Sequence, residues 1–263
     1  MATVILLRHG RTTSNASGIL AGWTPGVGLD DTGRAQATAV GQRLAHLPLA
    51  AVVTSPLQRC RETVAEVLAA RRAHLERQAA TSSARATRRR RTTTPEPPAI
   101  PEPVDDERLA ECRYGDWQGQ PLSKLAKDPL WTVVQQHPSA AVFPGPDGEP
   151  LAATAARAVA AIRDWDARIT AQYGAHAVWL ACSHGDVIKA IVADALGMHL
   201  DLFQRIVIDP CSLSIIRYTP TRPFLLRLND TGGEVPAPEP PRKQRRGART
   251  PSSDAVVGGG AGT

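Results

Sequence analysis

The sequence predicts an α/β protein built as a three-layer α/β/α sandwich, in which helices cover both faces of a mostly parallel central sheet. Short continuous apolar runs alternate along the chain with long Ala-rich stretches. Such runs, apolar on both faces, are typical of strands in parallel sheets. With 263 residues, of which 42% are hydrophobic and 21% charged, the chain is long enough to enclose a full core.

The first part of the chain is expected to contribute two strands and two helices. Residues 4–7 form a continuous apolar run and predict the first strand. Asp30 can cap a helix that ends near His46. Residues 51–54 predict the second strand, and Pro56 starts a helix that reaches about Ala70.

The second part is expected to contribute three helices and three strands. Glycines follow two of the predicted helices, where a left-handed residue commonly ends a helix. The helices are predicted at 122–136, 151–173 and 186–196, and the strands at 177–182, 212–218 and 224–228.

The basic character of the chain belongs to two segments. The net charge is +6, but residues 71–94 carry +7 and residues 236–263 carry +3, which leaves −4 for the rest. The first segment lies in a low-complexity Arg- and Pro-rich stretch, which we interpret as an insertion at 71–103 within a catalytic domain of residues 1–232. The second lies in a basic tail at 233–263, which we expect to be disordered.

The arginines at 88–91 and the basic tail leave open a role in binding nucleic acid or another polyanion. Neither segment has interleaved aromatic residues for base stacking, so a solvated insertion is the favoured interpretation. The oligomeric state does not follow from the sequence.

We expect a cytoplasmic protein whose cysteines are reduced. No apolar run approaches the roughly 20 residues that cross a bilayer, so we expect no membrane contact. The cysteines at 60, 112, 182 and 211 have neither metal-ligand nor CxxC spacing, which favours reduced structural thiols and no metal site.

Histidines and arginines gather where predicted strands end. Arg8, His9 and Gly10 follow the first strand, and the strand at 177–182 ends directly before Ser183, His184 and Gly185. The second strand leads through a Thr-Ser-Pro-Leu-Gln segment to Arg59, in the first turn of a helix. Because ligands of open α/β sheets bind at the carboxyl ends of strands, these groups predict one basic pocket that fits a phosphoryl group.

These motifs, taken together and in order, resemble the histidine phosphatase superfamily, the phosphoglycerate-mutase-like group. The chain is also similar to an actinobacterial-type subgroup labelled as probable phosphomutases. The matching segments are Arg8-His9-Gly10-x-Thr12-x-x-Asn15, Gly22-Trp23, Leu29-x-x-x-Gly33-x-x-Gln36-Ala37, Thr54-Ser55-Pro56-Leu57-x-Arg59-x-x-Glu62-Thr63, Leu109-x-Glu111-x-x-x-Gly115-x-Trp117-x-Gly119 and Ser183-His184-Gly185.

The resemblance implies a phosphoglycerate-mutase-like fold and a role for each matched residue. His9 would attack phosphorus and become phosphohistidine, and Glu111 would be the general acid. Glu111 must then be protonated at the start, so we expect burial near Tyr114 and Trp117 to raise its pKa. The residues implied to hold the phosphoryl group or the substrate are Arg8, Asn15, Gly22, Arg59 and His184.

The superfamily contains phosphatases and mutases, and the motifs favour a phosphatase that acts on a small phosphorylated metabolite. The nearest basic residues after Gly115 are Lys124 and Lys127, with no Arg pair to grip a bisphosphorylated cofactor. We therefore expect no cofactor, and 2,3-bisphosphoglycerate only if the chain is a mutase. The loop at 143–150 ends in Pro150 where phosphatase relatives often have Ser, which leaves its contact with the substrate open.

Overall fold

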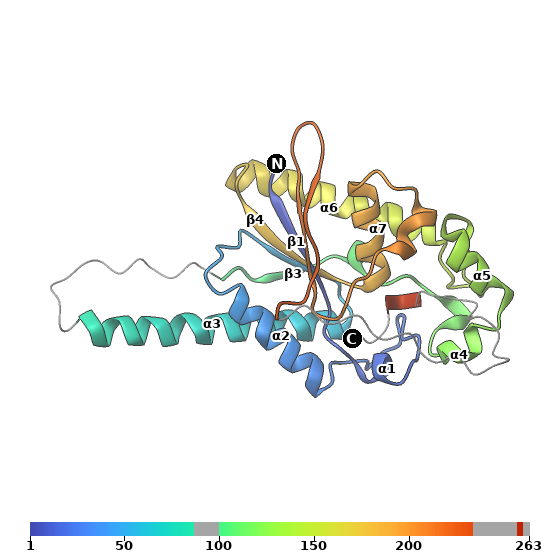
Figure 1. The fold of residues 1–263 in the computed structure, drawn as a ribbon, viewed down its shortest axis with the longest axis horizontal. Coiled ribbons are helices and arrows are strands. Elements are labelled where there is room, and N and C mark those ends of the chain that lie inside the picture. The colour runs from blue at the N-terminus through green and yellow to red at the C-terminus, as the bar shows by residue number, and fades with distance from the viewer. Residues whose placement is uncertain (87–99, 234–256, 260–263) are drawn as a thin grey trace.

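The computed structural model describes residues 1–86, 100–233 and 257–259, and its centre is one six-stranded sheet (Figure 1). The strand order is β3-β2-β4-β1-β5-β6. The first four strands in this order are parallel, and β5 and β6 complete the sheet with antiparallel pairing. The mostly parallel sheet of the prediction is confirmed. The strands are β1 (Thr3–Arg8), β2 (Val52–Thr54), β3 (Pro103–Asp105), β4 (Val178–Ser183), β5 (Leu213–Arg217) and β6 (Phe224–Asp230).

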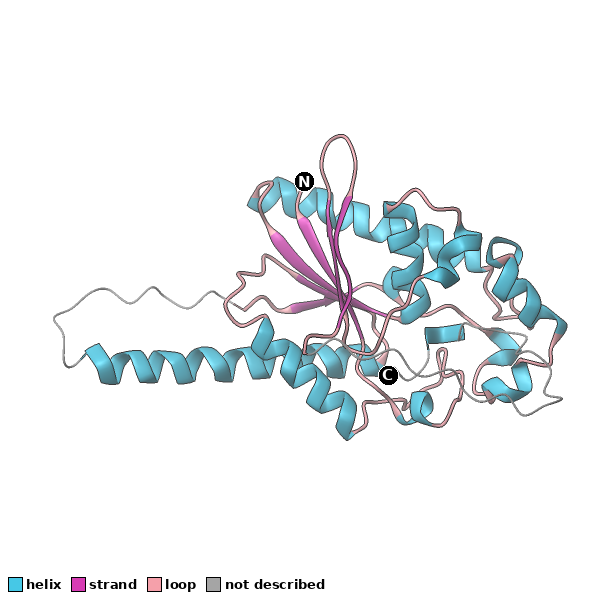
Figure 2. Cartoon of the chain, viewed as in Figure 1, coloured by secondary structure: helices cyan, strands magenta, loops and turns pink. Residues whose placement is uncertain are grey.

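Helices cover both faces of the sheet, which confirms the three-layer prediction (Figure 2). Successive residues of a strand point to opposite faces. In β1, Ile5 and Leu7 pack against α2 and α3, whereas Val4 and Leu6 belong to the apolar cluster that includes α6 and α7. The four helices are α2 (Asp31–Arg43), α3 (Gln58–Ala86), α6 (Leu151–Tyr173) and α7 (Gly185–Ala195).

The prediction of one continuous helix at 122–136 is wrong, because the chain forms two helices there. They are α4 (Leu122–Leu125) and α5 (Pro129–Gln136). The side chain of Asp128 accepts a hydrogen bond from the N–H of Leu130 and so caps a new helix, and proline is well suited to the first helical position.

Helix α3 extends beyond the predicted end near Ala70 and continues into the segment that we interpret as an insertion. The helix continues to Ala86 because its second half is rich in Ala and Arg, which favour helix. Arg71 is fully buried and donates a hydrogen bond to the carbonyl of Leu47, so it is part of the folded body. The arginines at 88–91 lie outside the described residues, and their binding role stays a prediction.

Several short elements were not predicted. Strand β3 lies at the end of the expected insertion, and its three residues are exposed, so no apolar pattern marks it. A four-residue helix, α1 (Thr13–Ala16), follows the first motif. The 3₁₀ helices are η1 (Glu107–Leu109), η2 (Gly115–Trp117), η3 (Pro138–Ala140), η4 (Leu200–Arg205) and η5 (Val257–Gly259).

The short turn η5 lies within the tail at 233–263, for which the sequence predicts disorder. For Val257–Gly259 the structure differs from that expectation, because Val257 is only 2% exposed and joins the apolar cluster on the α7 side of the sheet. The other residues of 234–263 lie outside the described part of the chain.

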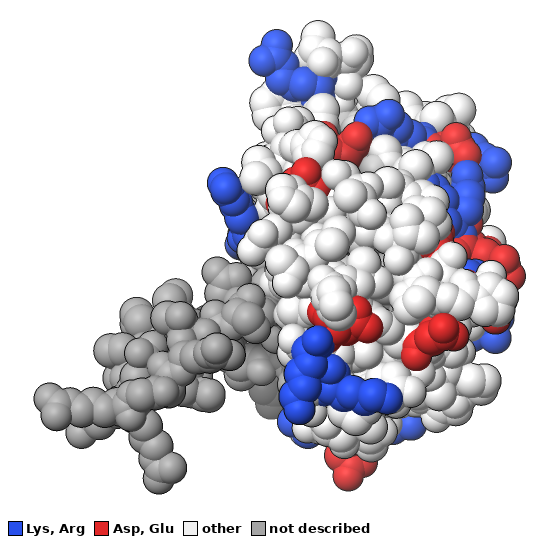
Figure 3. Space-filling view, turned by 90° about the vertical axis from the view of Figure 1, so that its right-hand side faces the viewer, with Lys and Arg blue, Asp and Glu red and all other residues white. Residues whose placement is uncertain are grey.

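The surface mixes charges of both signs. On the face drawn in Figure 3, the described Lys and Arg side chains are interspersed with Asp and Glu and separated by uncharged areas. Within the described residues, no helix is long and apolar enough to cross a membrane.

All four cysteines are free thiols, and all are buried. Burial raises the pKa of Cys112 and Cys182 well above the ordinary value and that of Cys211 to about 12. These thiols therefore stay protonated at neutral pH inside the folded protein.

Candidate active site

The two motif histidines lie side by side because strands β1 and β4 pair in register. Arg8 is opposite Ser183, so the next residue of each strand, His9 and His184, leaves the sheet at the same edge. The centroids of the two imidazole rings are 5.2 Å apart. The end of β2 is anchored to the same edge by a hydrogen bond from the N–H of Ser55 to the carbonyl of Cys182. The predicted convergence of strand ends is confirmed.

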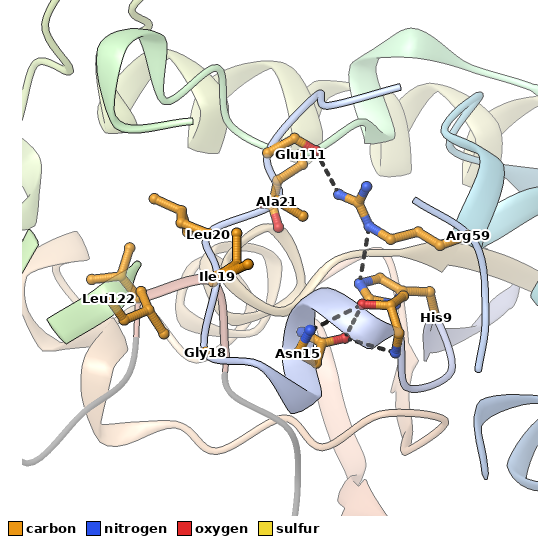
Figure 4. Close-up of a pocket in the computed structure, with 13 residues that line it drawn as sticks. His9, Asn15, Gly18, Ile19, Leu20, Ala21, Arg59, Glu111 and Leu122 are labelled. Atoms are coloured by element: carbon orange, nitrogen blue, oxygen red, sulfur yellow. Dashed lines mark hydrogen bonds between the residues drawn. The ribbon is translucent and has the colours of Figure 1, made fainter. Parts of the chain in front are cut away.

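His9 is held as a neutral imidazole with a defined tautomer. Its Nδ1 lies 2.8 Å from the carbonyl oxygen of Gly10, which can only accept, so Nδ1 carries the proton. The guanidinium of Arg59 donates from Nε to Nε2 of His9 at 3.3 Å (Figure 4). Burial lowers the pKa of His9 well below its ordinary value, and the charges of Arg59 and Arg8 lower it further. Nε2 is therefore an unprotonated, buried nitrogen that can act as a nucleophile.

Arg59 lies in the first turn of α3 and connects three parts of the site. Besides its contact with His9, its Nη2 donates to the carbonyl of Gly22 at 2.9 Å and lies 3.1 Å from Nδ1 of His184. Gly22 has a φ of +51°, and a Cβ there would lie 2.9 Å from the side-chain oxygen of Gln118. The glycine therefore allows the backbone turn that aims its carbonyl at Arg59.

His184 is fully buried behind Arg59. Its Nδ1 faces a guanidinium, which can only donate, so Nδ1 accepts and Nε2 donates to Oγ of Ser55 at 2.8 Å. Burial lowers the pKa of His184 well below the ordinary value, and the charge of Arg59 adds to this effect. Ser55, which sequence reasoning left without a role, therefore orients the second histidine.

Arg8 supplies a buried positive charge at the end of β1. It is fully buried, and its Nη1 donates to the carbonyl of Ile208 at 2.7 Å. Burial lowers its pKa to about 10, so the guanidinium stays charged at neutral pH.

Glu111 is a buried carboxyl group on the other side of the pocket. It is 3% exposed, and burial raises its pKa to about 7, with the charge of Asp186 as the next contribution. Its Oε1 accepts from the N–H of Cys112 at 3.1 Å, and its backbone carbonyl accepts from the indole of Trp23 at 2.7 Å. The predicted rise in pKa through burial agrees with the structure, whereas the contribution of Asp186 was not predicted.

Asp186 is the centre of a buried polar cluster beside Glu111. It lies in the first turn of α7, and its carboxylate accepts from Nζ of Lys189 and from the hydroxyl of Tyr114, each at 3.2 Å. Sequence reasoning did not single out Asp186. The sequence could have indicated it, because Asp186 is an acidic residue that directly follows the His184-Gly185 pair at the start of a predicted helix.

Arg157 of α6 fixes the backbone that carries Glu111. Its guanidinium donates to the carbonyls of Arg108, Ala110 and Glu111 at 2.8, 2.8 and 3.0 Å. Glu149 holds the same guanidinium in an ion pair at 2.8 Å. The loop at 143–150, whose role the sequence left open, therefore supports the candidate acid through Glu149.

The pocket itself is small and is lined by most of the predicted residues. Arg8 and His184 lie behind its wall and do not line it. Asn15 lines the pocket, and its Oδ1 accepts from the N–H of Thr12, which caps helix α1. The cavity volume is about 30 Å³. The lining residues are His9, Thr12, Asn15, Gly18, Ile19, Leu20, Ala21, Gly22, Arg59, Glu111, Leu122, Val257 and Gly258.

The described residues contain no group of three or more His, Cys, Asp or Glu side chains placed to hold a metal ion. The polar side chains that line the pocket include hydrogen-bond donors such as Arg59. They also include the unprotonated Nε2 of His9 and the titratable carboxyl group of Glu111.

A family model described as the histidine phosphatase superfamily (branch 1) matches residues 4–82 and 72–231. The chain belongs to the histidine phosphatase superfamily. This confirms the family indicated by the ordered motifs.

Relatives within the superfamily carry different names. The chain is 26% identical over 211 residues to a protein of Gloeobacter violaceus named 2,3-bisphosphoglycerate-dependent phosphoglycerate mutase 2, and the match covers 80% of this chain and 83% of that protein. The solved structure of Bacillus stearothermophilus YhfR has a TM-score of 0.67 at 25% identity, and the match covers 88% of this chain and 98% of that one. A phosphoserine phosphatase from Entamoeba histolytica has the same fold, with a TM-score of 0.67 at 19% identity over 88% of this chain and 98% of that chain.

Proposed function

We propose that this chain hydrolyses the phosphomonoester of a small metabolite through a phosphohistidine intermediate at His9. The observation that carries the proposal is the pairing of two groups across one pocket. His9 presents an unprotonated Nε2, and Glu111 has a pKa of about 7, so it can give and take a proton near neutral pH.

In the first step, the lone pair of Nε2 of His9 attacks phosphorus and a P–N bond forms. The bond between phosphorus and the ester oxygen breaks, and the electron pair stays on that oxygen. Glu111 donates its proton to the oxygen, so the product leaves as a neutral alcohol. The transition state spreads negative charge over the phosphoryl oxygens, which the guanidinium groups of Arg8 and Arg59 stabilise.

In the second step, the ionised Glu111 takes a proton from water and the water oxygen attacks phosphorus. The P–N bond breaks, its electron pair returns to Nε2 of His9, and phosphate leaves. Glu111 is protonated again at the end, so the cycle needs no external proton donor. His184 accepts from Nη2 of Arg59 through Nδ1 and so holds this guanidinium in position beside His9.

The pocket supports a hydrolase over a phosphomutase. A mutase that uses 2,3-bisphosphoglycerate must hold two phosphate groups, and the mutase name of the Gloeobacter relative makes this the alternative to test. Among the described residues that line the pocket, Arg59 is the one cationic side chain. We therefore propose that the reaction needs no bisphosphorylated cofactor.

The test uses the purified full-length chain and a panel of phosphomonoesters, with and without 2,3-bisphosphoglycerate. We expect release of free phosphate without the cofactor and an acid-labile phosphoprotein during turnover. His9→Ala should abolish both, whereas the exposed control His176→Ala should behave as the unmodified protein. Cofactor-dependent isomerisation with negligible phosphate release would contradict the hydrolase proposal, and full activity of His9→Ala would contradict the nucleophile.

A further inference from the structure

Two histidines and a glutamine converge outside the active site, where α3 passes the loop between α2 and β2. His46 lies in that loop, and His74 and Gln78 lie one turn apart on α3. The side-chain nitrogen of Gln78 is 3.0 Å from Nε2 of His46 and 2.9 Å from Nε2 of His74. We call these three residues the His46 cluster.

Both imidazoles of the cluster direct a lone pair at the same point. The side-chain nitrogen of a glutamine carries two hydrogens and can only donate, so it donates one hydrogen to each histidine. Nε2 is therefore the unprotonated nitrogen of both rings. This is the form in which imidazole binds a metal ion.

The spacing of the three groups is close to that of ligands around one metal ion. Ligand atoms of a tetrahedral zinc ion lie about 2.0–2.1 Å from the metal and hence about 3.4 Å from one another. The two distances between Gln78 and the imidazoles need to lengthen by only about 0.5 Å to reach this value. A half turn of the Gln78 amide places its oxygen, the atom that binds metal ions, where its nitrogen now lies.

The relative position of the two rings agrees with the same geometry. Two imidazoles that bind one tetrahedral ion through Nε2 have ring centroids about 5 Å apart. The ring centroids of His46 and His74 are 5.3 Å apart, and the ring planes are inclined at 80°. The rings therefore need no change of side-chain conformation to share an ion.

The charge around the cluster does not attract a cation. Arg71, Arg72 and Arg77 lie on the same helix, and their positive charges oppose the binding of a metal ion. The affinity must therefore come from the three donor atoms. A glutamate in place of Gln78 would supply a negatively charged ligand at the same position.

A metal ion in the cluster would attach α3 to the body of the protein a second time. The first attachment is the hydrogen bond from Arg71 to the carbonyl of Leu47, the residue after His46. Exposure increases along α3 from Arg71, which is buried, to residues 76–78, which are exposed. The helix then continues to Ala86 and extends away from the sheet (Figure 1). The cluster lies where α3 leaves the body.

We propose that the His46 cluster binds a divalent transition-metal ion of the Zn²⁺ type and thereby fixes the outward half of α3. Two imidazole nitrogens and one amide oxygen suit such an ion, and a water molecule would complete a tetrahedral site. The proposal is independent of the hydrolase function, because no residue of the cluster lines the pocket that contains His9.

The first test titrates Zn²⁺ into the full-length chain by isothermal titration calorimetry, without an affinity tag and after a chelator has removed bound metal ions. His46→Ala and His74→Ala should each weaken binding roughly tenfold or more, because each removes an imidazole ligand. The exposed control His176→Ala should bind as the unmodified chain does. Gln78→Glu should tighten binding roughly threefold or more, because a carboxylate is a better zinc ligand than an amide.

The second test measures hydrogen exchange of the backbone amides of residues 74–86 with and without Zn²⁺. Zinc should slow this exchange in the unmodified chain and leave it unchanged in His46→Ala. Equal zinc affinity of the unmodified chain and both histidine variants, or no zinc binding by the unmodified chain, would overturn the proposed site. Binding that depends on the histidines but leaves the exchange unchanged would overturn the fixing of α3.

Discussion

Replacing Glu111 with Gln should change how the free energy of unfolding depends on pH. In the folded protein the pKa of Glu111 is about 7, whereas its ordinary value is 4.5. Between these two values the folded chain keeps a proton that the unfolded chain has lost. This raised pKa stabilises the fold at low pH, and the stabilisation is lost as the pH rises through the window from 4.5 to 7.

The size of the effect follows from the two pKa values. A rise from 4.5 to about 7 corresponds to about 3 kcal/mol, at about 1.36 kcal/mol for each tenfold change in the acid dissociation constant. Between pH 5 and pH 8.5 the part of this stabilisation that is lost amounts to roughly 2–3 kcal/mol. Glu111 is 3% exposed, so water screens little of this effect. The amide that Glu111→Gln introduces cannot ionise, so the variant avoids this loss.

The assay is urea unfolding of the unmodified chain and of Glu111→Gln at pH 5 and at pH 8.5. The stability of the variant relative to the unmodified chain should increase by roughly 2–3 kcal/mol between the two pH values. Other titrating groups, such as the buried histidines, affect both proteins and cancel in this difference. Replacing the exposed Glu107 with Gln is the control and should give no such increase. The same relative stability of Glu111→Gln at both pH values would refute a buried carboxyl group with a raised pKa.

Three further outcomes follow from the site and its supports. In the unmodified chain, kcat/KM should fall about tenfold for each pH unit above about 7, because Glu111 must be protonated to start the reaction; a flat rate up to pH 9 would contradict this. Asp186→Asn removes a negative charge that raises the pKa of Glu111, so this fall should begin at lower pH, and an unmoved pH profile would exclude Asp186 as a positioning residue. Gly33→Ala should destabilise the fold by about 1–3 kcal/mol in denaturant unfolding, because its Cβ would lie 2.1 Å from the carbonyl oxygen of Arg11. Helix propensity alone predicts the opposite sign, a stabilisation of about 1 kcal/mol, which distinguishes the two effects.

The layers and the strand ends could be predicted because each depends on a local pattern. The run at 4–7 is apolar at every position, as expected for a strand that is buried on both faces of a parallel sheet. The helix at 151–173 was predicted with the observed bounds, because Pro150 precedes it and Gly174, with a φ of +87°, ends it. The proximity of His9 and His184 could be predicted because each follows a strand whose carboxyl end lies at the ligand-binding edge of an open α/β sheet.

Other parts of the site could not be predicted because they depend on contacts between distant segments. Arg157 reaches three carbonyls more than 40 residues away in the sequence, and Asp186 of α7 raises the pKa of Glu111, which lies 75 residues earlier in the chain. The turn η5 was missed because a single Val in a Gly-rich tail has no periodicity, and the apolar site that buries Val257 exists only after folding. Strand β3 was missed for a similar reason, since pairing with β2 defines it and its side chains are exposed.

The buried thiols of Cys60 and Cys182 can report when the sheet edge that carries His9 and His184 opens. Sγ of Cys60 lies 3.5 Å from Nε2 of His184, and Cys182 is the strand residue two positions before that histidine. A thiol reagent can reach these sulfurs only when the strand ends separate, so its rate of reaction in native buffer counts those openings. Phosphate or a bound inhibitor that holds the edge closed should slow the labelling in proportion to its occupancy, and ligand binding can thus be followed on the unmodified chain without any turnover.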